Sequence, residues 1–561
     1  MIDADKKALP IGNINFKQII AEDNYYVDKT DMIRDIIDYK IPVSLFTRPR
    51  RFGKTLNMDM LRTFFEKTEQ DNSVYFKNLK IWQYGEKYTS EQGKYPVIYF
   101  SFKEIKCLDW KSTCESLFGF ICEEFCRHME VAGSCGEYEN SLFDRIINSK
   151  ATQTDYEQSL RVLSKMLAKY YNTQVIIIID EYDTPIQSGY MRDFFTQIVS
   201  FMRNFFTGGF KDNLNLKFGF MTGILRVAKE NIFSGLNNLR VYSILDNDFS
   251  EYFGFTETEV DEMMEYYGYT DKLPKIKKWY DGYIFGESEI YNPWSLLNSI
   301  RDKCKLSPYW VNTSSNDIIR DLIRDADDKT AKNLHLLYEG KTISSSIDTA
   351  VTFPELQNSP NAVLSFLAIS GYLKAKRIIN EVEEDDEDDE EERYYLSIPN
   401  KELKTVYKKE VIAVISERFH NSFALQIGDA LFDRDIEEFG RLLQKFMLQS
   451  MSYFDASEAF YHGLILGICA IMTSKYKVES NRESGFGRFD VALFPLKTGL
   501  PSYIFELKLA KEGENLDELA KIGLEQIEKK EYITEFANMN ITDIQKIGIA
   551  FRGKETAIIQ K

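Results

Sequence analysis

The sequence predicts an α/β protein of several domains, and three observations support that prediction. The chain has 561 residues, which exceeds the common domain size of about 100–150 residues. In its first half, short apolar runs alternate with amphipathic helical patterns, as is typical of a parallel sheet. A shorter α/β pattern returns near the carboxyl end. With 44% hydrophobic and 28% charged residues, the composition excludes a mainly disordered or collagen-like chain.

The first domain is expected at residues 1–256. The run 175–179 is Val followed by four Ile, so every residue in it is β-branched. Such continuous apolar character is typical of a strand that helices cover on both faces. We therefore expect a parallel sheet between two helical layers. Its predicted strands are 42–47, 95–102, 174–180 and 216–222.

Helical patterns dominate the expected middle region, residues 257–420. The segment 401–415 places apolar residues on one helical face and lysines largely on the other. Before it, 371–380 and 393–397 predict two strands joined by the acidic run 381–392. We interpret this run as a solvated hairpin tip, with an acidic docking tail as the alternative. Two strands beside helices also suggest a winged-helix unit.

The last domain, expected at residues 421–561, is predicted as a compact α/β unit of strands and amphipathic helices. Its expected elements are helix 453–472, strands 489–495 and 502–509, helix 516–532 and strand 546–551.

The net charge of −17 argues against non-specific coating of nucleic acid or anionic membrane. Eleven of the acids lie in the run 381–392, and the balance without them is −6. A local basic groove is therefore compatible with the sequence.

Seven cysteines at irregular spacings, without paired C-x-x-C and with only four His, favour buried free thiols over a zinc site. No segment of signal-peptide type begins the chain. The longest apolar run, 463–472, is about half of a bilayer span. We expect a cytoplasmic protein with no membrane segment.

A phosphate-binding loop is predicted at residues 48–55, Arg-Pro-Arg-Arg-Phe-Gly-Lys-Thr, between a strand and the helical segment 56–66. In this context backbone N–H groups and the helix amino terminus bind phosphate. Lys54 would reach the β- and γ-phosphates of ATP, and the Thr55 hydroxyl would hold Mg²⁺. Arg48 stands where the strict G-x-x-x-x-G-K-[ST] pattern has its first Gly. A chance match in a basic loop is therefore the alternative.

Two adjacent carboxylates, Asp180 and Glu181, end the apolar strand 174–180. Phosphoryl transfer needs one carboxylate to support the Mg²⁺ shell and often a second to orient the attacking water. We assign Asp180 to the first role and Glu181 to the second. The pair supports ATP binding more strongly than ATP hydrolysis.

Four further residues complete the expected nucleotide contacts. Gly53 closes the phosphate loop, and Arg50 and Arg51 could contact phosphate, although a solvated basic loop is the alternative. The strand 216–222 is followed by Arg226, where a γ-phosphate sensor would sit in an ATPase sheet. Arg226 is the candidate charge stabiliser, with an ordinary strand-to-loop exit as the alternative.

A second constellation of charged residues lies near the carboxyl end. Glu506 and Lys508 share one face of their strand because side chains alternate. Asp490 opens the preceding strand, and a hairpin could bring it beside Glu506. Two carboxylates there could bind Mg²⁺, while the lysine could position water or neutralise developing charge. E-x-K alone is more often ordinary surface alternation.

Three neighbours bear on this constellation. Gln526 and Lys529 lie near the end of the following helix, where they could face the site. Glu458 is either a further metal ligand or a solvent-facing acid. We interpret His462 as a packed helix residue rather than a catalyst.

Together these motifs resemble the bacterial AAA-ATPase-like family, followed by a PD-(D/E)XK nuclease domain. The resemblance covers nearly the whole chain. The motifs that resemble the ATPase family are 25–30, 48–55, 179–185, 233–238, 279–283 and 291–294; those that resemble the nuclease are 481–490 and 505–508.

The resemblance implies a P-loop NTPase with a parallel sheet, fused to a restriction-endonuclease-like α/β domain, with Mg²⁺ at both sites. It also implies that Arg48 is usual at the position of the missing Gly. The residues it carries over are Lys54, Thr55, Asp180 and Glu181 for ATP, and Asp490, Glu506 and Lys508 for phosphodiester cleavage.

We expect an ATP-controlled, Mg²⁺-dependent nuclease whose last domain acts on nucleic acid, with DNA as the expected substrate. The alternative is an ATP-dependent switch or signalling protein whose nuclease-like domain binds but does not cut. A homo-oligomer, such as a ring or filament, is left open by the sequence.

Overall fold

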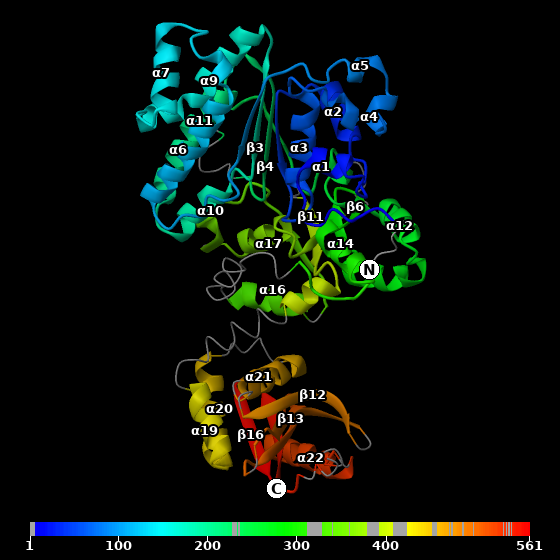
Figure 1. Cartoon of the computed structure of the whole chain (residues 1–561). Helices are drawn as coiled ribbons and strands as arrows, with labels where there is room; N and C mark the ends of the chain where they lie inside the picture. Colours follow the sequence, from blue (N-terminus) through cyan, green and yellow to red (C-terminus); the bar gives the residue numbers. More distant parts are fainter. Residues whose placement is uncertain are drawn as a thin grey trace, which may run out of the picture. The chain divides into compact units, whose positions relative to one another are not determined.

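The chain forms two compact units, one of Met1–Ser315 with Leu336–Val406 and one of Asn316–His335 with Tyr407–Lys561 (Figure 1). Each unit is considered by itself. The computed structural model describes residues 6–226, 233, 236–310, 328–338, 340–357, 359–378, 392–407, 423–450, 457–470, 472, 475–484, 487–497, 499–530, 532, 533, 536, 539 and 541–561.

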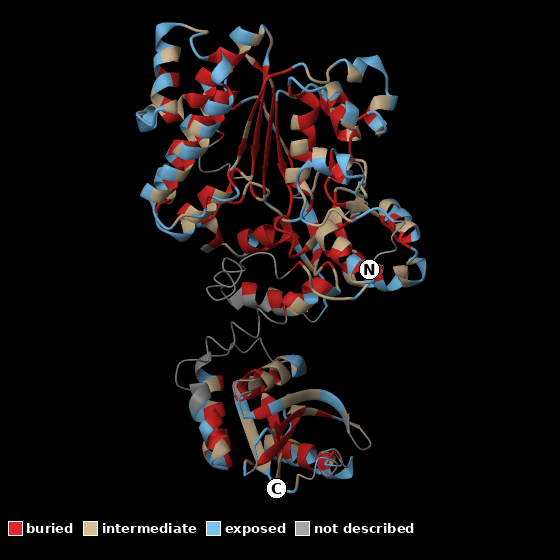
Figure 2. Ribbon diagram, in the orientation of Figure 1, coloured by how far each residue is buried: buried red, intermediate tan, exposed pale blue. Residues whose placement is uncertain are grey.

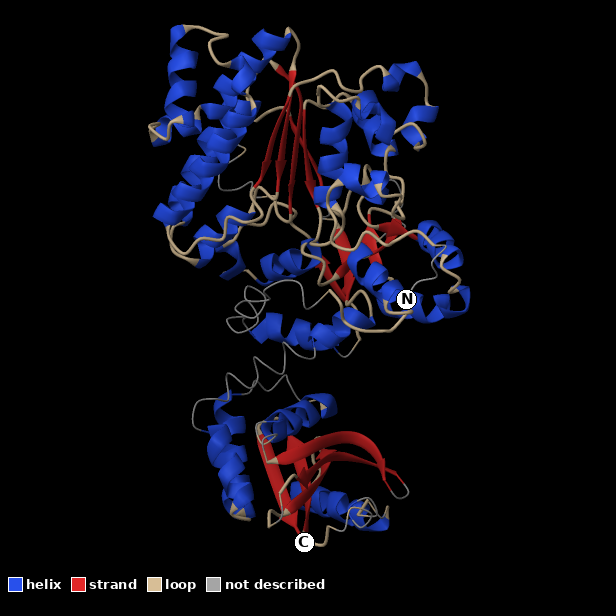
Figure 3. Cartoon of the chain, viewed as in Figure 1, coloured by secondary structure: helices blue, strands red, loops and turns tan. Residues whose placement is uncertain are grey.

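A five-stranded parallel sheet lies at the centre of the first unit (Figure 3). Its strand order is β2-β3-β4-β1-β5. The four predicted strands are confirmed as β1 to β4. The fifth strand was not predicted, because it has only four residues and one of them is a charged arginine. The strands are β1 (Val43–Thr47), β2 (Val97–Ser101), β3 (Val175–Asp180), β4 (Leu216–Gly223) and β5 (Leu239–Tyr242).

Helices cover both faces of this sheet, with α9 and α11 on one side and α3 on the other (Figure 1). Every residue of β3 is buried, and Figure 2 shows the buried strands between the two layers. The predicted layer order is therefore confirmed. The helices are α1 (Phe16–Ala21), α2 (Asp31–Tyr39), α3 (Lys54–Phe65), α4 (Lys80–Gln83), α5 (Glu86–Thr89), α6 (Trp110–Arg127), α7 (Glu137–Ile147), α8 (Gln153–Glu157), α9 (Ser159–Tyr171), α10 (Thr184–Met191) and α11 (Phe195–Phe210).

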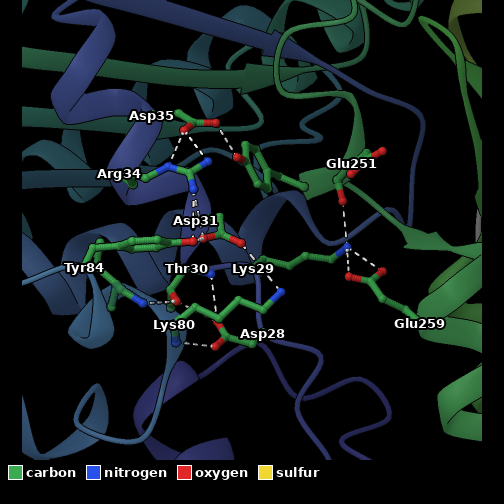
Figure 4. Close-up of polar contacts among 12 residues, drawn as sticks. Asp28, Lys29, Thr30, Asp31, Arg34, Asp35, Lys80, Tyr84, Glu251 and Glu259 are labelled. Carbon is green, nitrogen blue, oxygen red and sulfur yellow. Dashed lines mark hydrogen bonds and ion pairs between the residues drawn. The ribbon is translucent and has the colours of Figure 1, made fainter.

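Asp28 and Lys29, in the Tyr-Val-Asp-Lys-Thr run, anchor the amino-terminal segment (Figure 4). The buried Lys29 ammonium donates to both carboxylate oxygens of Glu259 and to the carbonyl oxygen of Glu251, each at 2.6 Å. Asp28 accepts the backbone N–H of Lys80 at 2.7 Å. This run therefore connects to Lys80 and to the segment of Glu251 and Glu259, both of which are distant in sequence.

Helices with two small three-stranded sheets, β6-β8-β7 and β10-β11-β9, follow the large sheet. The predicted strand pair before residue 401 is confirmed as antiparallel β10 and β11. The acidic residues 381–391 and the helical prediction beyond residue 407 lie outside the described residues. The elements are β6 (Phe255–Thr256), α12 (Glu257–Tyr266), α13 (Leu273–Tyr280), β7 (Tyr283–Phe285), β8 (Ser288–Tyr291), α14 (Pro293–Arg301), α16 (Asp328–Tyr338), β9 (Ile343–Ser346), α17 (Pro360–Ile369), β10 (Lys374–Arg377) and β11 (Arg393–Ser397).

The second unit contains a five-stranded mixed sheet, β12-β13-β14-β15-β16, in which only β14 and β15 are parallel. Its strand with the E-x-K pattern, β14, is central. One face packs on α22 and the other on α19, α20 and α21. The elements are α19 (Phe423–Phe432), α20 (Ile436–Ser450), α21 (Glu458–Ala470), β12 (Tyr476–Ser484), β13 (Gly487–Pro495), β14 (Ser502–Leu509), α22 (Leu516–Lys529), β15 (Ile544–Arg552) and β16 (Glu555–Gln560).

All seven cysteines are free thiols, but only Cys469 is buried and Cys126 is exposed. The expectation of buried thiols is therefore right for Cys469, wrong for Cys126 and met only in part by the other five, which are partly buried. Within the described part of the chain, no helix has the length and apolar character needed to cross a membrane.

Candidate nucleotide and nuclease sites

The phosphate loop turns sharply between β1 and α3. Gly53 caps α3 in the left-handed region at φ 83°, and Arg51 also has a positive φ of 69°. Gly53 suits this position because glycine has no Cβ to clash there. Lys54 is the first residue of the helix, so the loop ends at a helix amino terminus, where the backbone N–H groups favour an anion.

Lys54 is bound to its own loop. Its buried ammonium donates to the carbonyl oxygens of Arg48 and Pro49, each at 2.9 Å. Burial lowers the pKa of Lys54, and the negative charges of Glu181 and Asp183 oppose that effect. The lysine therefore lies inside the loop with its donors directed at backbone oxygens.

Arg48, at the position of the missing Gly, is fully buried and structural. Its guanidinium donates to the carbonyl oxygens of Thr47, Tyr242 and Phe249 at 2.9, 2.7 and 3.3 Å. It also lies over the ring of Phe253, 5.1 Å from the centroid. Burial lowers its pKa to about 9. The arginine thus joins the loop to the end of β5 and to the segment that follows it.

Asp180 lies at the carboxyl end of β3, fully buried and surrounded by hydroxyl groups. Thr55 donates to its Oδ2 at 2.8 Å, and Ser101 lies 3.4 Å from the same oxygen. Thr222 donates to its Oδ1. Burial raises the pKa of Asp180, and the threonine hydrogen bonds oppose that rise. Four elements meet at this carboxylate, including the predicted pair Thr55 and Asp180.

Glu181 has a positive φ of 50°, and its backbone N–H donates to the Thr222 hydroxyl at 3.1 Å. Two residues on, Asp183 accepts the N–H groups of Ile224 and Leu225 at 2.7 and 3.1 Å. Asp183 therefore fixes the loop that carries Arg226.

The three predicted arginines differ in their surroundings. Arg226 has a buried Nε with no hydrogen-bond partner among the described residues. Arg50 donates to the side-chain oxygen of Gln187 at 3.2 Å. Arg51 lies over the Trp294 ring, 4.3 Å from its centroid, and burial lowers its pKa. Arg50 and Arg51 are thus held by side chains of α10 and α14.

The carboxyl-terminal constellation assembles on the hairpin of β13 and β14. The pairing of Val491 with Phe505 places Asp490 and Glu506 at the next opposed position, on one face. The carboxylate of Asp490 reaches across to accept the Leu507 N–H at 2.7 Å.

Glu506 and Lys508 form an ion pair in this cluster. The Lys508 ammonium donates to Glu506 Oε1 and to the side-chain oxygen of Gln526, both at 2.8 Å. Gln526 in turn donates to the same Glu506 oxygen. Burial, followed by the charge of Asp490, raises the pKa of Glu506 to about 7. Its other oxygen, Oε2, is buried and has no hydrogen-bond partner among the described residues.

The residues of α21 and α22 that were considered as neighbours of this pair differ in their contacts. His462 Nε2 lies 2.9 Å from the carbonyl oxygen of Asp490. Glu458 is exposed, yet its negative charge is among the causes that raise the pKa of Asp490, the largest being burial. Lys529 lies away from the cluster, exposed and 3.4 Å from Glu525.

Two glycines let α22 lie close to the sheet and so bring Gln526 to Glu506. A Cβ on Gly548 of β15 would lie 2.1 Å from the carbonyl oxygen of Ala520. A Cβ on Gly523 would lie 3.3 Å from the carbonyl oxygen of Glu506.

The donors in both clusters fit Mg²⁺, which takes one or two carboxylates and keeps several waters. Asp490 and Glu506 supply two carboxylates, and the unpartnered Glu506 oxygen is a free acceptor within the described residues. Thr55 and Asp180 supply hydroxyl and carboxylate oxygens. Where the structure describes the chain, no three His, Cys, Asp or Glu side chains group as metal ligands.

Several supporting residues were not predicted from the sequence. The sequence indicated Ser101 and Asp183 only weakly. Ser101 lies near the end of the expected strand 95–102, and Asp183 lies just beyond the expected strand 174–180. Trp294 lies in the motif 291–294, which gives no indication of its contact with Arg51, and no sequence pattern indicates a role for Trp310.

Two family models match separate parts of the chain. The model described as Predicted AAA-ATPase matches residues 10–233, and that of the PD-(D/E)XK nuclease superfamily matches residues 456–561. The chain is also similar to an "Uncharacterized protein in vnfD 5'region" of Azotobacter chroococcum mcd 1, with 28% identity over 330 residues. That match covers 57% of this chain and 57% of the relative. The chain therefore combines a segment that matches the predicted AAA-ATPase family with one that matches the PD-(D/E)XK nuclease superfamily.

Proposed function

We propose that this chain binds and hydrolyses ATP and thereby controls Mg²⁺-dependent cleavage of nucleic acid, with DNA as the substrate. One observation carries the proposal: each predicted cluster comes together around a buried carboxylate. Thr55 donates a hydrogen bond to Asp180 in the first cluster, and Lys508 donates one to Glu506 in the second.

In the ATP site, Lys54 would leave its loop carbonyls and bind the β- and γ-phosphates. Thr55 and Asp180 would hold Mg²⁺, which supplies charge neutralisation at the phosphates. Glu181 would orient the attacking water, and Arg226 would stabilise charge that develops on the transferred group. The loop fixed by Asp183 keeps Arg226 near the end of β4.

In the nuclease site, Asp490 and Glu506 would hold Mg²⁺. The ion polarises a phosphodiester and lowers the pKa of bound water. Lys508 would orient the attacking water and neutralise charge that develops on the phosphate. Gln526 keeps both side chains in place, because it contacts Glu506 and Lys508 together.

The alternative is an ATP-dependent switch whose nuclease-like domain binds without cutting. The net charge of −17 weighs against prolonged contact with DNA in both readings, because such contact needs several localised Lys or Arg residues. Retention of the full-length protein on DNA at low salt, without strand breaks, would support this alternative.

The test is cleavage of plasmid DNA by the purified protein in Mg²⁺, with and without ATP. We expect Lys508→Ala to abolish cutting and to leave ATP turnover intact, and Lys54→Ala to abolish ATP turnover. Lys529→Ala, an exposed lysine of α22, is the matched control and should cut normally. Normal cutting by folded Lys508→Ala protein would refute the nuclease proposal.

A further inference from the structure

Residues beyond the matched ATPase segment contact the phosphate loop directly. The indole N–H of Trp310 donates to the carbonyl oxygen of Arg50 at 3.2 Å. The ring of Trp294 supports the Arg51 guanidinium. Phe52, fully buried, packs on Tyr283 with ring centroids 4.9 Å apart. Three successive loop residues are thus held by side chains that follow residue 280.

The Trp310 contact fixes the direction of a peptide group. A trans peptide is planar, and its C=O and N–H point in opposite directions. Because the Arg50 carbonyl is directed at the indole, the N–H of Arg51 points away from Trp310. In phosphate loops the anion is bound by such outward backbone N–H groups. The indole therefore determines where one donor of the loop points.

Trp310 is itself held in place. It is 2% exposed, and its backbone N–H donates to Glu402 Oε1 at 2.8 Å. Ser295 donates to the same oxygen at 3.0 Å. Glu402 is fully buried, and its Oε2 has no hydrogen-bond partner among the described residues. The ring of Tyr372 packs edge-on against Trp310, with centroids 5.0 Å apart. These contacts leave the indole little freedom to turn.

We infer that Trp310 is a positioning residue of the nucleotide site: held by Glu402, it orients the Arg50–Arg51 peptide so that the Arg51 N–H is directed at bound phosphate. The inference rests on the proposed ATP binding. It assigns part of the site to a segment that lies more than seventy residues after the matched region 10–233.

The test compares the MgATP affinity of the full chain and two variants, measured with a fluorescent ATP analogue well below the unfolding temperature. Trp310→Phe keeps an aromatic ring and removes the indole donor. We expect it to weaken affinity about fivefold, the worth of one hydrogen bond of about 1 kcal/mol. Trp82→Phe, on α4, is the matched control and should bind as wild type. Wild-type affinity in Trp310→Phe overturns the inference.

A second readout separates positioning from mere packing. ATP should change the tryptophan fluorescence of the wild type and of Trp82→Phe, and this change should be smaller in Trp310→Phe, in which Trp294 still contacts the loop. Glu402→Gln keeps an acceptor for the Trp310 N–H and should retain affinity, whereas Glu402→Leu should lower it. Equal affinity in both Glu402 variants, or an unchanged fluorescence response in Trp310→Phe, contradicts the inference. Failure of the wild type to bind ATP would overturn the proposed function as well.

Discussion

The two candidate sites differ in how much of the chain each one draws on. The nucleotide site gathers contacts from Arg48 to Glu402, including residues of β1, β2, β3 and β4 and a tryptophan beyond α14. The nuclease-like site takes its polar contacts from His462 to Tyr532, mainly from one hairpin and one helix.

This difference has a physical consequence. Asp180 is surrounded by neutral hydroxyls from separate elements, so its geometry depends on the packing of the whole first unit. Glu506 is held by a lysine two residues away and by Gln526 on the adjoining helix. Changes far away in sequence should therefore disturb the first site, while the second should respond mainly to local changes.

The largest expected effects come from replacing the central carboxylate of each site, Glu506 or Asp180. We expect Glu506→Gln to lower DNA cleavage by about 10²–10³-fold with ATP turnover retained, a loss of the size seen when one electrostatic catalytic group is removed. Asp180→Asn should lower ATP turnover by a similar factor. Initial rates of plasmid cleavage and of phosphate release measure the two effects.

Two exposed positions serve as controls for these variants. Glu525→Gln on α22 and Asp144→Asn on α7 make the same chemical changes away from the sites and should keep both activities. Loss of ATP turnover in Glu506→Gln would contradict the independence of the two clusters.

The next effect concerns Arg48. Arg48→Gly restores the strict loop pattern, but it leaves the buried carbonyls of Tyr242 and Phe249 without their donor. We expect the free energy of unfolding of the first unit to fall by about 4 kcal/mol, from unsatisfied groups at about 1–3 kcal/mol each. Denaturant titration measures this loss. Arg301→Ala, a half-exposed arginine of α14, is the control and should change stability little. A more stable Arg48→Gly protein would contradict the structural role of Arg48.

A pH effect of smaller size is expected at Glu402. Burial raises its pKa from 4.5 to about 7 in the folded protein. The folded state therefore holds the proton more tightly, and the stability from this group is complete below about pH 4.5 and is lost as pH rises through 7. The shift corresponds to about 3 kcal/mol, at about 1.4 kcal/mol for each pKa unit. Glu402→Gln should remove this part of the pH dependence.

Unfolding titrations at pH 5, 6, 7 and 8 measure the free energy of unfolding of the wild type and of Glu402→Gln. The difference between the two values cancels the contribution of other titrating groups. A constant difference across this range would contradict the prediction.

The smallest effects come from the groups that support each carboxylate. We expect Thr222→Val to lower ATP turnover, and Gln526→Leu to lower cleavage, each by about fivefold, since each loses hydrogen bonds worth about 1 kcal/mol. The loss in Gln526→Leu should be confined to cleavage, whereas Thr222→Val should also lower cleavage that depends on ATP. A loss of ATP turnover in Gln526→Leu would show that the sites are not separate.

The sequence predicted the local parts of both sites well. Strand alternation placed Glu506 beside Lys508, and a strand–loop–helix context placed Lys54 and Thr55 at a helix start. In the fold, the strands β1 to β4 of the first sheet were predicted because apolar residues dominate them. Short β5 and β9 were missed, since four residues carry too little periodicity to be distinguished from loop.

Contacts between distant segments could not be predicted in this way. Arg48 looked like a defect in the loop pattern, and only the fold reveals the carbonyls that it binds. Trp310 and Glu402 belong to no motif, because their roles depend on tertiary packing that brings residue 402 to a loop near residue 50. Asp183 was visible as an acid, but its partners Ile224 and Leu225 could not be inferred from spacing.

The two hydrogen bonds between Lys54 and its own loop make ligand binding an exchange rather than an addition. Phosphate must displace the carbonyl oxygens of Arg48 and Pro49, so the number of bonds made by the ammonium need not rise. What changes is the charge of its partner, from a carbonyl dipole to an anion. The gain would therefore be mainly electrostatic, and because Lys54 is buried, salt would screen it less than it screens a pair of exposed charges. A neutral nucleoside would offer no such gain, so in the proposed site the loop itself would favour phosphorylated ligands.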